Sequence, residues 1–113
     1  MKIVVQATKI DLTPSIEVYI EQKLGSLARF VKRFDDQGQP ELRVEIARTT
    51  RHHRHGAVFM AEGNLRLPQQ LLRGEAYHED IRAAIDGLRK TLRLEIEKYK
   101  TKHSAKPRVK NVY

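Results

Sequence analysis

Four basic residues recur in the C-terminal half of the chain at a spacing that could bind phosphate. They are Arg82, Arg89, Arg93 and Lys100. At about 100° per residue, their side chains fall within roughly 20° of one line along a helix, and at 1.5 Å per residue that line is about 27 Å long. Guanidinium groups bind phosphate oxygens in a bidentate manner. The pattern predicts a basic ridge that contacts a nucleic-acid backbone. The alternative is a solvated helix face, partly neutralised by nearby acidic side chains.

Other basic residues could extend this ridge. From Lys98 to the C-terminus the chain contains basic residues and no acidic one, which is typical of a nucleic-acid arm or of a solubilising tail. An earlier segment carries Lys23, Arg29 and Lys32. If this segment and the ridge form two helices that pack side by side, Lys23 or Arg29 would extend the ridge, and the sequence leaves open which.

Three histidines occur close together at 52, 53 and 55, next to Arg51 and Arg54. Such a cluster could bind zinc, but the ion needs a fourth ligand, and no Cys or nearby carboxylate offers one. We interpret the segment as a basic loop that becomes more positive below about pH 6.5, and we expect neither a metal nor a cofactor. The chain shows no Gly-rich phosphate loop and no hydrolase or protease motif, so we expect no enzyme. A metal-dependent enzyme that uses the histidines is a rival hypothesis.

The composition limits the remaining possibilities. The chain has 113 residues and a formal net charge of +8, which suits one domain with a polyanionic partner. The absence of Cys excludes disulfides and thiol catalysis. No apolar run approaches the roughly 20 residues of a membrane helix, and we expect neither a membrane nor a small-molecule partner. Aromatic residues make up only 6%, which favours recognition of phosphates and shape over base stacking.

The hydrophobic pattern predicts the elements that position these residues. Strands are expected at 2–7, 41–49, 57–67 with a bulge or bend at 62–64, and 71–76. A first helix is expected at 14–33, with Thr13 as its N-cap and Pro14 at its first position, followed by a loop at 35–40. A second helix is expected from 78–80 to 100, capped by Asp80, with Ile81, Leu88 and Leu92 on its apolar face.

The last three strands are joined by short connections, which predicts an antiparallel meander. The order β-α-β-β-β-α indicates an α+β fold, with a four-stranded sheet and two helices packed on one face. We expect one domain at residues 1–102 and a basic, flexible tail at 103–113.

Three stretches of the chain resemble a known family, the ribosome hibernation-promoting factors together with the ribosome-associated inhibitor A proteins. Residues 12–16 (Leu-Thr-Pro-Ser-Ile) look like the start of the family's first helix, and residues 53–58 (His-Arg-His-Gly-Ala-Val) are similar to its basic hairpin. Residues 79–86 (Glu-Asp-Ile-Arg-Ala-Ala-Ile-Asp) resemble its signature Glu-Asp-Met-Tyr-x-Ala-Ile-Asp. The similarity covers about residues 1–102, and the family shares the predicted order of elements.

The resemblance implies a cytoplasmic protein that binds small-subunit rRNA in the decoding groove. Such a protein blocks mRNA and A- and P-site tRNA, and it inhibits translation in stationary phase or stress. It also implies contacts by Lys23, Arg29, Lys98 and Lys102, whereas helical geometry supports Arg82, Arg89 and Arg93. The full candidate set for rRNA binding is Lys23, Arg29, Lys32, Arg82, Arg89, Lys90, Arg93, Lys98, Lys100 and Lys102.

The sequence departs from the family signature at two positions. Ile81 stands in place of Met, and Arg82 in place of Tyr, which exchanges an aromatic contact for a cation. The length resembles the short form of the family and the basic tail its hibernation-promoting branch. We expect a monomer away from the ribosome, and the short form admits a separate ribosome-dimerising factor as partner. A general double-stranded RNA-binding module, which also places two helices on one sheet face, is the alternative function.

Overall fold

One mixed sheet forms the base of the fold. The computed structural model describes residues 1–50 and 57–102. The strands are β1 (Lys2–Thr8), β2 (Glu41–Thr50), β3 (Ala57–Leu67) and β4 (Gln70–His78), and they lie in this order across the sheet. β1 pairs with β2 in parallel, and the other two pairings are antiparallel. The predicted meander of the last three strands is therefore confirmed.

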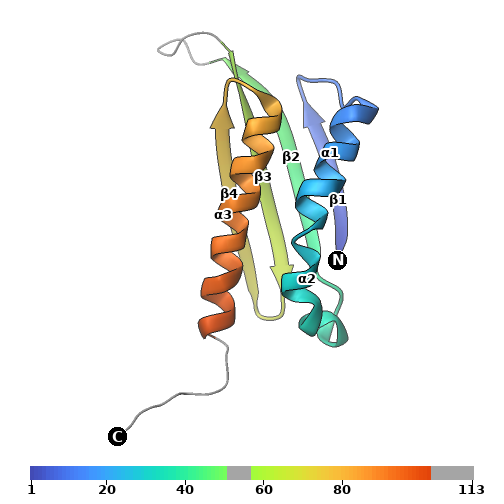
Figure 1. The fold of residues 1–113 in the computed structure, drawn as a ribbon, viewed down its shortest axis with the longest axis vertical. Helices are drawn as coiled ribbons and strands as arrows, with labels where there is room; N and C mark the ends of the chain where they lie inside the picture. The colour runs from blue at the N-terminus through green and yellow to red at the C-terminus, as the bar shows by residue number, and fades with distance from the viewer. Residues whose placement is uncertain (51–56, 103–113) are drawn as a thin grey trace, which may run out of the picture.

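The helices lie together on one face of this sheet (Figure 1). They are α1 (Pro14–Gly25), the short α2 (Ala28–Val31), the 3-10 helix η1 (Lys32–Gln37) and the long α3 (Ile81–Lys102). The first three belong to the crossover that the parallel pairing of β1 and β2 requires. The predicted α+β class, with its order β-α-β-β-β-α and its helices on one face, is confirmed.

Both predicted helix starts are confirmed. Thr13 Oγ1 accepts a hydrogen bond from the Ile16 N–H at 3.2 Å, and Pro14 occupies the first turn of α1, where its missing N–H costs nothing. Asp80 Oδ1 accepts from the Arg82 N–H at 3.3 Å at the start of α3. Asp80 therefore marks the residue at which α3 and its ridge begin, and the sequence alone identifies this cap.

The prediction of one continuous helix at 14–33 was wrong. α1 ends at Gly25, and a tight turn at Leu27 leads into α2, with the Leu27 N–H donating to the Leu24 carbonyl at 3.0 Å. The apolar period hid the break because Leu24, Leu27 and Val31 all remain fully buried across it. The loop expected from residue 35 also begins later, because η1 runs to Gln37.

Two strand predictions also need correction. The register of β3 against β2 and β4 continues through residues 62–64, so there is no bulge. Gly63 instead lets α3 approach the sheet, because an added Cβ would lie 3.0 Å from Leu92 Cδ1. β4 extends from 70 to 78 rather than from 71 to 76. Longer pairing with β3 stabilises both of its ends.

The core lies between the sheet and the helices. It includes Ile20 and Leu24 from α1, Leu42 and Ile46 from β2, and Leu88 from α3, all with no exposed area. The predicted apolar face of the second helix is confirmed. No helix within residues 1–50 and 57–102 is both long and apolar enough to cross a membrane.

The opposite face of the sheet carries charges of both signs. Strand alternation places four basic and four acidic side chains there, and several form ion pairs, including Arg66 with Glu41 and Arg73 with Glu62. This face is close to electrically balanced. A surface that attracts polyanions must therefore be sought among the helices. The expected tail at 103–113 lies outside the described residues, so the domain division stays a prediction.

A candidate nucleic-acid interface between the helices

The basic ridge of α3 faces α1 and α2. Arg82 Nη2 donates a hydrogen bond to Ser15 Oγ at 2.6 Å, near the start of α1. Arg89 Nε donates to Ser26 Oγ at 2.8 Å and to the Lys23 carbonyl at 3.1 Å, at the end of α1. These arginines thus join two helices that lie more than 60 residues apart in the chain.

Arg89 has a structural role in this arrangement. The last carbonyls of a helix lack partners within the helix and carry its negative dipole end. The Lys23 carbonyl is such a group, and it accepts hydrogen bonds from both Arg89 and the Ser26 hydroxyl. The Arg89 guanidinium therefore stabilises the end of α1, where the chain turns towards α2.

Phe30 gathers three cations. The guanidinium carbons of Arg93 and Arg29 lie 4.5 and 4.8 Å from its ring centroid, and Lys100 Nζ lies 6.0 Å away. A cation over an aromatic face is attracted by the quadrupole of the ring. Phe30 can therefore hold like charges together that would otherwise repel one another.

Tyr19 has a comparable role near the start of the ridge. Lys23 Nζ and the Arg82 guanidinium carbon each lie 5.5 Å from its ring centroid. Its hydroxyl donates to Asp86 Oδ1 at 2.7 Å. This hydrogen bond, followed by burial, raises the pKa of Tyr19 above its ordinary value. The phenol thus stays protonated and occupies one oxygen of a carboxylate that lies among the cations.

These contacts define a surface that we call the basic seam. Two adjoining hollows lie along it: one of about 460 Å³, lined by residues including Lys23, Ser26 and Arg89, and one of about 330 Å³, which Arg89 shares. Two carboxylates, those of Asp86 and Glu97, lie beside the cations. Glu97 pairs with Arg93 at 3.5 Å. The basic seam consists of Lys23, Arg29, Arg82, Arg89, Arg93 and Lys100.

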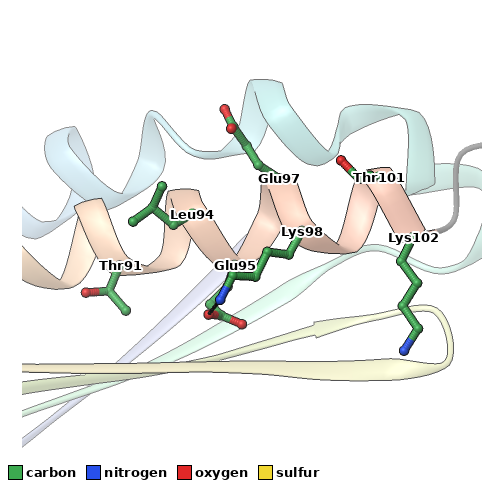
Figure 2. A pocket seen from close by; sticks show the side chains of 7 residues that line it. All are labelled: Thr91, Leu94, Glu95, Glu97, Lys98, Thr101 and Lys102. Carbon is green, nitrogen blue, oxygen red and sulfur yellow. Dashed lines mark hydrogen bonds and ion pairs between the residues drawn. The ribbon is translucent and has the colours of Figure 1, made fainter.

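Four of the ten candidate residues lie outside the seam. Lys90 is exposed and borders the smaller hollow, while Lys32 is exposed at the first residue of η1. Lys98 and Lys102 extend from the opposite flank of α3, and Lys98 Nζ pairs with Glu95 at 3.3 Å (Figure 2). Of the residues implied by the family resemblance, the structure therefore unites Lys23 and Arg29 with the arginines implied by helical geometry, but not Lys98 and Lys102.

Sequence reasoning missed the neutral side chains that hold the seam. Tyr19, Ser26 and Phe30 all contact its cations, and together with Lys23 they are spaced by four, three and four residues. This is the period of one helix side, adjacent to the apolar stripe. The spacing was therefore present in the sequence, but it does not show that these neutral side chains face the cations of α3, which depends on how the helices pack.

The histidine hypothesis stays untested. Within residues 1–50 and 57–102, no group of three or more His, Asp or Glu side chains could hold a metal ion. His52, His53 and His55 lie outside these ranges.

Comparison with known proteins identifies the class of this fold. The sequence model of the family described as "Sigma 54 modulation protein / S30EA ribosomal protein" matches residues 3–104. The chain belongs to this family. The resemblance noted from the sequence is therefore confirmed, because the named relatives of the chain are ribosome hibernation promotion factors.

Two of these relatives come from Deinococcus radiodurans and Lactococcus lactis. Each is 27% identical to this chain, over 94 and 108 residues, which is 83% and 96% of this chain. The matches cover 46% and 54% of the relatives, so the chain spans about half the length of the curated relatives it matches.

Two solved structures share the fold. The N-terminal domain of Protein Y from Thermus thermophilus is 25% identical, with a TM-score of 0.64, and the match covers 88% of this chain and 99% of that one. A ribosomal subunit interface protein from Coxiella burnetii is 20% identical, with a TM-score of 0.66 and coverage of 89% and 99%. The second likeness concerns the fold alone.

Proposed function

We propose that this protein is a ribosome hibernation factor whose basic seam binds rRNA of the small ribosomal subunit. In the decoding groove it would block mRNA and A- and P-site tRNA, and so inhibit translation in the cytoplasm during stress or stationary phase. One observation carries the proposal: cations from two distant segments converge on a single seam and are oriented there by aromatic and hydroxyl groups. The names of the relatives support the choice of the ribosome as the partner.

The contacts within the seam suit phosphate binding. Arg82, Arg89 and Arg93 are held by partners on the neighbouring helix, so fewer side-chain rotations are lost when an anion binds. Their remaining N–H groups can donate to phosphate oxygens. The near-balanced open face of the sheet gives no comparable attraction. The protein would therefore approach rRNA with its helices.

Co-sedimentation with small ribosomal subunits over a range of salt concentrations tests this proposal. Neutralising each phosphate releases counterions, so affinity should fall steeply as salt rises. Lys23→Glu should weaken binding strongly, because Lys23 is exposed in the seam and its carbonyl contact with Arg89 does not involve the side chain. The matched control is Arg43→Glu, the same change of sign on the open face of the sheet, which should bind as the wild type does.

Two outcomes would contradict the proposal. The protein could remain in the supernatant at low salt, or Lys23→Glu could bind as tightly as the wild type. An excess of plain RNA duplex should not displace the protein from subunits, and equal competition would favour the double-stranded RNA-binding module. Loss of mRNA and tRNA binding to subunits that carry the protein would support the proposed block, whereas undiminished binding would remove it.

A further inference from the structure

The edge strand β4 presents an unusual pattern to its free side. Within the sheet of the described residues, β4 has only β3 as a neighbour, and Figure 1 shows it at the opposite edge from β1. Its nine residues pair with β3 without interruption, and they include no Pro. Such an edge exposes unpaired N–H and C=O groups, which natural proteins usually protect with bulges, prolines or repelling charges.

The sequence of β4 complements itself around Gly74, its middle residue. If a second β4 pairs antiparallel across a two-fold axis at Gly74, Arg73 lies opposite Glu75 twice, once on each side of the axis. Leu71 lies opposite Tyr77 in the same way. All four side chains alternate onto the open face of the sheet, where cross-strand partners touch.

The same residues disfavour other arrangements. Parallel pairing in register would place Arg73 against Arg73 and Glu75 against Glu75, which is destabilising. A register shifted by one residue would oppose side chains from different faces. The apolar pair would also cover exposed surface, since Leu71 is 58% exposed and Tyr77 is 43% exposed.

The helix layer continues this surface. α3 packs over β4 and β3, and the flank that faces away from α1 contains a hollow lined by Thr91, Leu94 and Lys98, among others (Figure 2). Leu94 is 54% exposed. A two-fold copy at the β4 edge would bring its own α3 towards this flank, whereas the basic seam lies on the other flank and stays accessible.

We infer that β4 pairs with β4 of a second copy of this chain, which joins two sheets into one of eight strands. This differs from the monomer expected from the sequence, and it does not depend on ribosome binding. The partner is another copy rather than an unrelated strand, because the alternation of charge and apolar residues about Gly74 is self-complementary.

Sedimentation velocity of the ribosome-free protein tests this inference. The wild type should form dimers. Glu75→Arg places arginines opposite each other at two sites and should raise the dimer dissociation constant about tenfold or more. Its own fold should be preserved, because residue 75 lies opposite Glu62 in β3 and the change removes a like-charge neighbour. Arg43→Glu, on the internal strand β2, is the matched control and should dimerise normally.

A mixing experiment makes the test specific. The Arg73→Glu variant alone should also be monomeric. Its fold is checked by circular dichroism, because Arg73 pairs with Glu62 within its own chain. Equal amounts of Arg73→Glu and Glu75→Arg should form a heterodimer, since two Glu residues then face two Arg residues. The inference is overturned if the wild type is monomeric at all soluble concentrations. A β4 edge that binds only another protein, and not a second copy of this chain, would give that result. Dimers that persist in Glu75→Arg would overturn it as well.

Discussion

Replacing Phe30 with Leu tests whether an aromatic ring holds the cations of the basic seam. Two guanidinium groups, those of Arg93 and Arg29, lie within 4.8 Å of the ring, and each such exposed contact contributes about 0.5–1 kcal/mol. Leu retains an apolar side chain at this half-buried position but lacks the quadrupole. The free energy of unfolding should therefore fall by about 1–2 kcal/mol, and Phe30→Tyr should lose less than about 0.5 kcal/mol.

Urea denaturation followed by circular dichroism measures these changes. A double-mutant cycle with Arg93→Met separates the loss of the cation–π contact from the loss of packing. It should give a coupling of about 0.5–1 kcal/mol between Phe30 and Arg93. A coupling of zero would refute the reasoning, since Phe30 would then act through its volume alone.

Three further predictions concern the contacts of Arg89 and Tyr19 in the seam and the packing of α3 on the sheet. Arg89→Met should lower the free energy of unfolding by about 1–2 kcal/mol in urea denaturation, because the C-terminal carbonyls of α1 lose a charged donor; unchanged stability would refute that role. Gly63→Ala should cost about 1–3 kcal/mol in the same assay, because its Cβ would crowd Leu92, and a stabilised variant would show that α3 can shift. In ultraviolet titrations, Asp86→Asn should lower the raised pKa of Tyr19, because the hydrogen bond to the carboxylate is lost. In the wild type, this hydrogen bond should contribute its full stability below pH 10, and the contribution should disappear as the pH rises through the pKa of Tyr19 in the folded protein. The same tyrosine pKa in both proteins would contradict the assignment.

The arrangement of elements could be predicted because the residues that specify it act locally. Thr13, Pro14 and Asp80 mark helix starts through contacts within one turn, and the alternating strands report which side is buried. The end of α1 could not be predicted in this way. Besides the local Ser26 hydroxyl, the carbonyl of its last turn accepts a hydrogen bond from Arg89, a residue more than 60 positions away.

The candidate site could likewise be predicted only where local geometry determines it. The common direction of the arginines in α3 follows from helical geometry, and so the ridge could be recognised from residue spacing alone. Its partner surface could not, since pairing with Phe30 and Tyr19 depends on how two helices pack. Gly63 was misread for a similar reason, because a glycine within a strand can indicate either a bulge or a close neighbour.

The salt dependence of ribosome binding tests the central claim most directly. The slope of log K against log salt should be smaller in magnitude for Lys23→Gln than for the wild type, by about 0.7–0.9, because one phosphate contact is lost. Arg43→Gln, on the open face of the sheet, should keep the slope of the wild type. Equal slopes for all three proteins would contradict the assignment of the basic seam as the surface that binds rRNA.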